Sequence, residues 1–356
     1  MKTLTALPIH MRTHARKLAL SLFSLSLFVV ALQIMKTGAR PLEPLIHEHL
    51  QVHSLWDGLG FGWITASAIL SGSPVAAIAV TLYDGRAISR FAAFGMINGS
   101  RIGAAFMVLL VGYMYSLRGE RSRDGIGVGL LAALVAQSVH FPALLIGSVL
   151  LRLGMFERLP VEQMEGVTSL MDRALDPLLD LLTRLLPDVA LFPLGVLIML
   201  FCFRLFDRAL PEVTLENTRF SSENGFLSNP LLMFALGFGI TFLTLSVSVS
   251  LGLLVPLTAK QIVNREQVVP YIMGAGISTF ADTFVAAVIL QDAKTIALVT
   301  VAILTITLIS MTYILVAFRA YERALLRFTD LLMADRWALR VYLAAFVLIP
   351  FTLILT

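Results

Sequence analysis

The chain has a single cysteine, Cys202, in 356 residues. One cysteine excludes an intrachain disulfide, and no cysteine–histidine spacing typical of structural zinc is present. Charged residues are also scarce, at 14% of the chain, whereas soluble domains have roughly a quarter. With 58% hydrophobic residues and a mean hydropathy of +0.86, the composition excludes an ordinary soluble globular domain and indicates a membrane protein.

The sequence also lacks the short motifs of common enzyme chemistry. It contains no Walker loop, nucleophile elbow or metalloprotease helix, and acids inside apolar runs are too few for a carboxylate-pair hydrolase. The formal charge of +4 comes from arginines that flank apolar runs rather than from a nucleic-acid-binding surface. We therefore predict no enzymatic activity, no resident cofactor and no nucleic-acid partner.

Long apolar runs are abundant. Six approach or exceed the roughly 20 residues that cross about 30 Å of hydrocarbon: Leu18–Met35, Phe91–Leu117, Ile126–Leu151, Val189–Phe206, Val268–Leu290 and Ile296–Phe318. A final run, Val341–Thr356, is short and is expected to span only if the bilayer thins or flanking residues help. The sequence predicts an all-α polytopic membrane protein with about seven crossing helices.

The first apolar run follows a basic segment that contains Arg12, Arg16 and Lys17. The run is longer than the core of a secretory signal, and residues 36–40 make a poor cleavage site. We predict a retained first helix in the cell membrane (plasma or inner), with the N-terminus in the cytoplasm.

The chain is internally duplicated with an offset of 175 residues. Between residues 62 and 102 the two copies share ten identities in 41 positions without a gap, including Ser71/Ser246, Ser73/Ser248, Arg90/Arg265 and Gly99/Gly274. Repeats of this size are typical of secondary transporters, whose sites form where the repeats meet. The expected division is an N-terminal repeat (1–151), an amphipathic connector (152–187), a C-terminal repeat (188–318), and an amphipathic helix with a last short span (319–356).

Each repeat contains one apolar stretch interrupted by polar or small residues. Residues 59–83 are broken at Ser71-Gly72-Ser73-Pro74, and residues 231–258 carry Ser246, Ser248 and Ser250. Each stretch is either a kinked crossing helix or a re-entrant hairpin of two half-helices whose tip reaches the bilayer midplane. Counting lysine and arginine on the two sides does not separate these alternatives. The Gly-Ser-Pro break favours hairpins, which make the repeats inverted.

Residues 71–103 and 246–279 resemble the two signature regions of the sodium/phosphate cotransporter family. That family carries a Gln-Ser-Ser-Ser element in each hairpin and a Gly-Ala-Asn-Ile-Gly-Thr element in the next helix. The resemblance covers about half the chain and is closest at residues 270–275. It implies two inverted repeats, two re-entrant hairpins and sodium-coupled phosphate uptake at a central site. The chain departs from the family at both glutamines, which correspond to Leu70 and Leu245, and at both asparagines, which correspond to Arg101 and Gly276.

Broken helices in a membrane offer unpaired N–H groups and hydroxyls to an anion. The residues that we predict to bind substrate are Ser71, Gly72, Ser73, Ser246, Ser248, Ser250, Asn98 and Arg101. The serines are otherwise small helix-packing residues, and Asn98 otherwise caps a break. Arg101 stands within an apolar run and either binds an anion, pairs with Asp282, or reaches toward an interface.

Asp282 is the one acidic residue inside a well-formed apolar run. It either coordinates sodium with neighbouring hydroxyls and carbonyls, couples transport to protons, or pairs with Arg101. The residues predicted to bind or couple the cation are Asp282, Thr283, Ser278, Thr279 and Thr244.

Histidines provide weaker signals. His140 either lines the pathway or is satisfied by a neighbouring helix, and the group His47, His49 and His53 either binds a metal or lies at the interface. Arg319, Arg323 and Arg327 lie four residues apart in a segment suited to an anionic cytoplasmic surface.

The sequence as a whole predicts a secondary transporter of a small anion, with sodium and phosphate as the pair that the resemblance implies. A proton-coupled organic anion transporter and a non-transporting sensor or assembly subunit remain alternatives. The expected partners are phosphate or a similar anion, sodium and the lipid bilayer. The oligomeric state stays open, with a homodimer among the possibilities.

Overall fold

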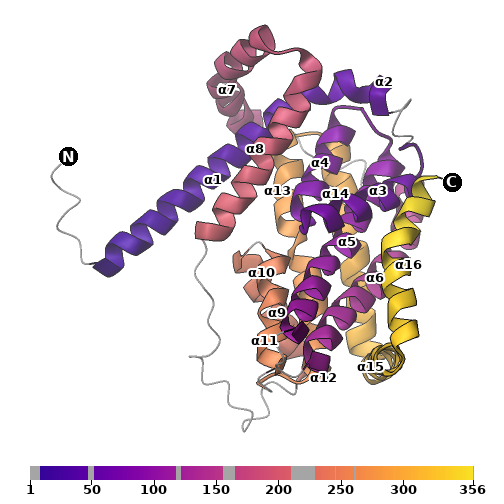
Figure 1. Cartoon of the computed structure of the whole chain (residues 1–356). Helices are drawn as coiled ribbons and strands as arrows, with labels where there is room; N and C mark the ends of the chain where they lie inside the picture. The colour runs from indigo at the N-terminus through magenta and orange to yellow at the C-terminus, as the bar shows by residue number, and fades with distance from the viewer. Residues whose placement is uncertain are drawn as a thin grey trace.

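The computed structural model describes residues 9–46, 52–117, 122–154, 165–209, 229–244, 246–259 and 262–355. Every regular element in these ranges is a helix (Figure 1). By length and composition, seven helical segments can cross a membrane. They are α1 (Ile9–Ala39), α5 (Arg90–Leu117), α6 (Ser122–Arg152), α8 (Asp188–Ala209), the consecutive pair α12 (Arg265–Ser278) and α13 (Phe280–Leu290), α14 (Ala293–Val316) and α16 (Arg336–Ile354). The prediction of an all-α, multi-pass protein is confirmed at this level.

Shorter helices lie between these segments. They are η2 (Arg40–Leu42), α2 (Glu43–Leu45), α3 (Leu55–Ile69), α4 (Ser73–Asp84), α7 (Glu165–Leu185), α9 (Pro230–Thr244), α10 (Val247–Gly252), α11 (Leu254–Ala259) and α15 (Phe318–Ala334).

The last apolar helix is longer than the sequence pattern indicated. Asp335 caps it, since its carboxylate accepts a hydrogen bond from the Trp337 N–H at 2.9 Å. The helix therefore begins at Arg336 and has 19 residues, so the expectation of a short final run from Val341 is wrong. The first residues of the helix include two arginines, so a prediction based on apolar runs alone placed its start too late.

The duplication is preserved in how the helices pack. Helices α3 and α9 have the same limits when the offset of 175 residues is applied. In each copy the helix packs closely on the next long helix through glycines. A Cβ on Gly62 would lie 2.2 Å from the Met96 carbonyl oxygen, and one on Gly237 would lie 2.0 Å from that of Tyr271. Met96 and Tyr271 are equivalent positions, so the backbones of the two copies meet in the same register.

The first interrupted stretch turns back on itself. Helix α3 runs parallel to α5, because Gly95 meets Leu55 and Gly103 meets Trp63. The chain nevertheless enters α5 at the end where α3 began, since the Ser89 hydroxyl donates to the His53 carbonyl at 3.0 Å. Helix α4 must therefore run back from the break toward the start of α3.

The second interrupted stretch follows the same course. Helices α9 and α12 pack as α3 and α5 do. Gly237 meets Tyr271 as Gly62 meets Met96. Gly274 lies between Phe234 and Phe238 as the equivalent Gly99 lies between Leu59 and Trp63, so α9 and α12 are parallel as well. Helix α10 then folds back beside α9, as the Thr241 hydroxyl donates to that of Ser250 at 2.6 Å. In each copy, therefore, a helix and the helical segment that folds back beside it pack next to the helix that follows them, which is α5 in the first copy and α12 in the second.

The first helices of the two copies, α1 and α8, pack against each other in opposite directions (Figure 1). A Cβ on Gly38 would lie 2.3 Å from the backbone nitrogen of Phe192. Further along, the Cys202 thiol donates to the Ser24 carbonyl at 3.0 Å. Residue numbers fall along α1 as they rise along α8, so the two helices are antiparallel.

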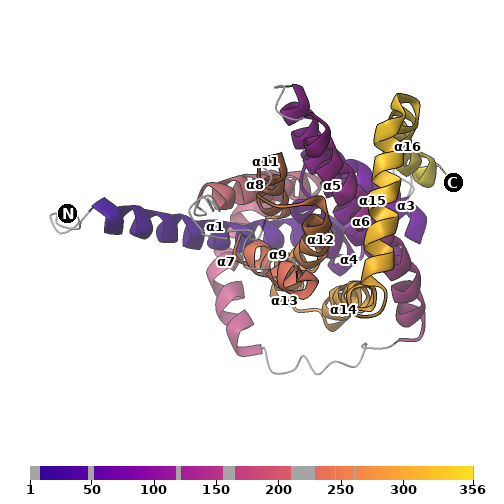
Figure 2. The ribbon, with the colours of Figure 1, turned by 90° about the horizontal axis from the view of Figure 1, so that it is seen from below.

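Helices α15 and α16 complete one side of the bundle. Helix α15 lies across one end of the bundle, whereas α16 runs alongside α3 (Figures 1 and 2). The three arginines of α15 are four residues apart, and its buried residues are Leu325, Thr329 and Leu332. The helix is therefore amphipathic, as its sequence pattern predicted.

Candidate functional site

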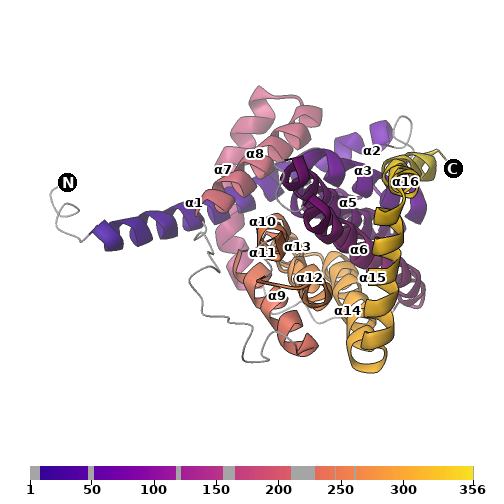
Figure 3. The ribbon, with the colours of Figure 1, turned by 60° about the horizontal axis from the view of Figure 1, so that its bottom comes forward.

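The two breaks open onto one cavity of about 510 Å³. Segments from both copies line it, and α9 to α13 lie beside α5 and α6 when the bundle is tilted so that its bottom comes forward (Figure 3). Six of the residues predicted from the sequence line this cavity: Ser71, Gly72, Ser73, Arg101, Ser246 and Thr279. Ser71 and Ser246 occupy equivalent positions in the two copies, so the duplication brings a matching serine from each copy to one space.

The first break is defined by backbone geometry. Leu70 ends α3 in the left-handed conformation (φ 61°), which is strained for a side chain that bears a Cβ. Helix α4 then starts with proline in its first turn and has no side-chain cap. Proline suits a first turn because it lacks the N–H that would be unpaired there. The other free N–H groups of this turn remain at the cavity wall with Gly72 and Ser73.

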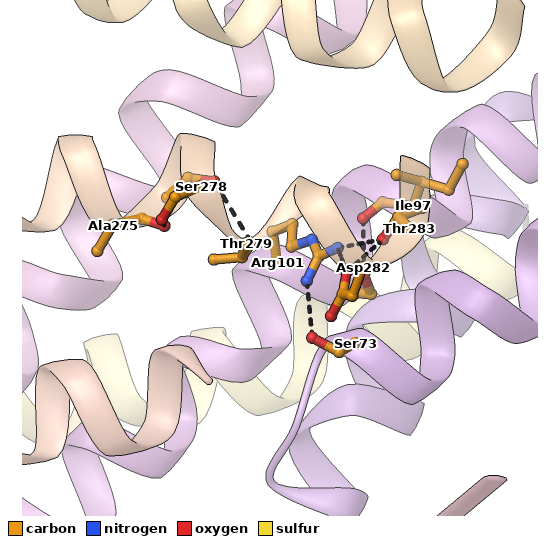
Figure 4. Close-up of polar contacts among 10 residues, drawn as sticks. Ser73, Ile97, Arg101, Ala275, Ser278, Thr279, Asp282 and Thr283 are labelled. Atoms are coloured by element: carbon orange, nitrogen blue, oxygen red, sulfur yellow. Dashed lines mark hydrogen bonds and ion pairs between the residues drawn. The ribbon is translucent and has the colours of Figure 1, made fainter. Parts of the chain in front are cut away.

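Arg101 projects from the middle of α5 to the tip of this break (Figure 4). Its Nη1 donates to the Ser73 hydroxyl at 3.4 Å, and its Nη2 donates to the Thr283 hydroxyl at 2.6 Å. Nη2 also lies 3.4 Å from Oδ1 of Asp282, and the Thr283 hydroxyl donates to the same oxygen at 2.9 Å. One guanidinium thus joins the break in the first copy to a helix of the second.

The ion pair is incomplete. Arg101 and Asp282 are both buried, yet Nε of the arginine and Oδ2 of the aspartate have no hydrogen-bond partner among the described residues. The guanidinium carbon lies 4.6 Å from the centre of the Phe280 ring, which adds a cation–π contact. Buried polar atoms are nearly always satisfied, so these two enclosed atoms leave the ion pair with unused hydrogen-bonding capacity.

Asp282 also borders a second, apolar cavity of about 320 Å³ beside α1, α8 and α9. The arginine lines the first cavity and the aspartate lines the second. The pair therefore lies between the two cavities.

The second break contributes fewer serines to the cavity wall than its sequence pattern indicated. The Ser246 hydroxyl caps α10 by accepting the Val249 N–H at 3.3 Å. Ser250 does not line the cavity, since it is fully buried and its hydroxyl is bonded to those of Thr241 and Tyr271 at 2.6 and 2.9 Å. The side chain of Ser248, which we predicted as a ligand, lies outside the described part of the chain.

The fold places only some of the predicted cation ligands near one another. Asp282 and Thr283 are adjacent to Arg101, and Thr279 lines the cavity. The hydroxyls of Ser278 and Thr244 instead donate to backbone carbonyls, of Ala275 at 3.2 Å and of Ser246 at 3.3 Å. Among the described residues, no group of three or more histidine, cysteine or acidic side chains is placed to hold a metal ion. His47 and His49, considered above as metal ligands with His53, lie outside the described residues.

Asn98 and His140 form a buried pair next to this network. Asn98 does not line the cavity; its amide nitrogen donates to the Phe94 carbonyl at 2.9 Å, and its Oδ1 lies 3.1 Å from Nδ1 of His140. His140 does line the cavity. Its ring stacks on Phe280 with centroids 6.2 Å apart, so the histidine and Arg101 share one aromatic neighbour.

Arg204 is a cavity residue that the sequence reading missed. It lies on α8, is exposed, and lines the same cavity as Arg101. Its position near the end of an apolar run made it resemble an ordinary flanking arginine. A possible signal was the absence of a matching charge in the other copy, where Val29 occupies the equivalent position.

No protein-family model, curated protein or solved structure matches this chain.

Proposed function

We propose that this protein is a secondary active transporter that moves a small anion through the cavity between its two copies, with sodium-coupled phosphate symport as the leading form. The observation that carries the proposal is the meeting of both helix breaks with the buried Arg101 in one partly polar cavity. A charged side chain inside a membrane is energetically unfavourable, and such residues typically line a pathway for a substrate or an ion. The guanidinium supplies the planar donor set that suits an oxyanion.

We further propose that the copies are inverted repeats and that α3–α4 and α9–α11 are re-entrant hairpins. The antiparallel packing of α1 and α8 supports inversion, because equivalent helices of a parallel repeat would cross the membrane in the same direction. The arm lengths support re-entry. Helix α3 has 15 residues and α4 has 12, which is about 22 and 18 Å at 1.5 Å per residue, less than the thickness of the hydrocarbon core. The tip meets the long helix in its middle, since Gly72 packs on Ser100.

Coupling follows from competition for Arg101. An arriving anion takes the hydrogen bonds that Asp282 now holds, and the released carboxylate then attracts a cation. A cation that binds Asp282 first frees the arginine in the same way. Each solute therefore favours binding of the other, as reciprocity between linked sites requires.

The decisive experiment is uptake of labelled phosphate into liposomes that contain the purified protein. We expect uptake driven by an inward sodium gradient, and loss of that uptake in Arg101→Gln. Uptake that ignores sodium but follows a pH gradient would favour proton coupling through Asp282. The absence of both uptake and anion binding in the wild-type protein would overturn the transport proposal and favour a sensor or assembly subunit.

The second candidate is proton-coupled transport of an organic anion. It is favoured by the apolar cavity beside Asp282, where the unpartnered Oδ2 is screened from water. In this form a proton replaces sodium as the ion that takes the carboxylate once the pair opens. Labelled dicarboxylates in the same liposomes test this candidate.

A further inference from the structure

His140 is held in one tautomer by its neighbour. The amide nitrogen of Asn98 is used by the Phe94 carbonyl, which can only accept a hydrogen bond. The amide oxygen must therefore be the atom that faces Nδ1 of His140 at 3.1 Å. Because this oxygen can only accept, Nδ1 carries the proton. A buried imidazole with no carboxylate partner is neutral, so the second ring nitrogen, Nε2, has a free lone pair.

That lone pair has no partner within the protein. No described residue hydrogen-bonds to Nε2, and Nε2 is not among the fully enclosed polar atoms that lack a partner. His140 lines the central cavity. Nε2 is therefore an acceptor on the cavity wall, fixed in place by the Asn98 contact on one edge of the ring and by Phe280 on its face.

The other strong polar groups of the cavity are of the opposite kind. Arg101 and Arg204 can only donate, and the free N–H groups at the start of α4 also only donate. A ligand that satisfies all of them needs negatively charged oxygens for the donors and one O–H group for Nε2. A fully deprotonated anion satisfies the donors but turns a charged oxygen toward the imidazole lone pair.

We propose that His140 is a specificity-determining residue that selects oxyanions which keep a proton, and that Asn98 positions it. This inference rests on the proposed anion site and defines its substrate class. At neutral pH inorganic phosphate carries at least one O–H group, whereas sulfate, of nearly the same size and shape, carries none. The cavity is thus selective for phosphate-type anions over sulfate. A site that leaves a buried acceptor unmatched loses about 1–3 kcal/mol, which corresponds to roughly 5- to 150-fold in affinity.

The test is calorimetric binding of inorganic phosphate and of sulfate to the purified full-length protein in lipid nanodiscs at pH 7 and constant ionic strength. We expect the wild-type protein to prefer phosphate by at least about fivefold. In His140→Phe, which keeps a ring but removes the acceptor, the two affinities should become equal within about threefold through loss of phosphate binding. His140→Gln, which restores an acceptor oxygen, should recover part of the preference. Asn98→Ala should lower it, because the ring is then free to change tautomer.

His53→Phe is the matched control, because His53 is exposed and does not line the cavity; it should leave the preference unchanged. Equal binding of phosphate and sulfate by the wild-type protein would overturn the inference, and so would a preference that survives in both His140 variants. A parallel loss of both anions in both variants would also overturn it, since that is the result of a purely structural role. In each of these outcomes the wild-type protein still binds anions in a manner that depends on Arg101, so the proposed transport function stands. Absence of any Arg101-dependent anion binding would remove both proposals.

Discussion

Replacing Asp282 with asparagine removes one negative charge from the cavity wall while it keeps a side chain of nearly the same size. In the wild-type protein an anion has to displace this carboxylate from Arg101 before it gains the full guanidinium. The contact between Nη2 and Oδ1 is 3.4 Å, longer than the 2.7–2.9 Å of a strong charge-assisted bond. Its loss therefore belongs at the lower end of the roughly 1.5–3 kcal/mol given for hydrogen bonds to charged groups.

The expected result is tighter binding of phosphate together with the loss of coupled transport. Because opening the pair no longer costs about 1.5 kcal/mol, the affinity of Asp282→Asn for phosphate should rise about tenfold in the absence of sodium. Sodium should not change that affinity in the variant. In the wild-type protein saturating sodium should raise it toward the value of the variant, because the cation takes the carboxylate from the arginine.

The assay is isothermal calorimetry on protein in nanodiscs, with and without sodium, followed by uptake in liposomes. Asp330→Asn is the matched control, since Asp330 forms a 2.8 Å pair with Arg265 at an exposed position away from the cavity; it should alter neither affinity nor uptake. A fall in the phosphate affinity of Asp282→Asn would refute the reasoning, because it would mean that the carboxylate orients the arginine for the anion instead of competing with it. Sodium-driven uptake at the wild-type rate in the variant would refute the coupling role.

Three further results are expected. Gly237→Ala should destabilise the fold by about 1–3 kcal/mol and so lower its melting temperature in detergent, because the new Cβ would meet the Tyr271 carbonyl. Gly239→Ala should leave the melting temperature unchanged, because a Cβ there has no atom within 4 Å to clash with. Equal melting temperatures for the two variants would contradict the close packing of α9. Cysteines placed at Ser54 and Asn229, equivalent positions in the two copies, should react with a membrane-impermeant maleimide from opposite sides of the membrane, in a background without the native cysteine. Labelling from the same side would contradict the inverted repeats. Arg204→Gln should weaken phosphate binding less than Arg101→Gln, with a steeper loss at low salt, because the exposed charge is screened by ions; binding that is unchanged at every ionic strength would exclude Arg204 from the site.

Local features of the sequence were enough to predict the elements. The apolar runs located the spans because a stretch that crosses a bilayer has to be long and apolar wherever its neighbours lie. The break after Ile69 was predictable from the Gly-Ser-Pro segment, since proline cannot continue a helix and prefers the first turn of a new one. The start of α16 was missed because the apolar pattern begins several residues after its cap, Asp335.

The duplication could also be predicted, and with it the correspondence of the breaks. Gly62 and Gly237 stand in register in the sequence and make the same backbone contact in the structure. A copied segment keeps its close packing only if the small residues at the contact are kept, so sequence identity at glycines carried structural information. Identities at leucine or valine carried little structural information, because many apolar side chains are equally suitable where a helix faces lipid.

The partners of the polar residues were decided by the tertiary structure alone. Arg101 and Asp282 are 181 positions apart, and spacing in the sequence left the arginine's role open between anion, carboxylate and interface. The same uncertainty applied to Ser250, whose hydroxyl is used by Thr241 and Tyr271, and to His140, whose tautomer is set by Asn98 on another helix.

The amino-acid sequence thus determined which segments are long and apolar enough to cross a membrane, where two further apolar stretches break, and that the chain consists of two copies. These properties depend on residues close together in the chain, through hydrophobicity, helix capping and backbone sterics. Which hydroxyls and charges meet in the cavity depended on how helices from the two copies pack. A polar side chain takes whichever partner the packing brings within about 3 Å, and no local pattern records that choice.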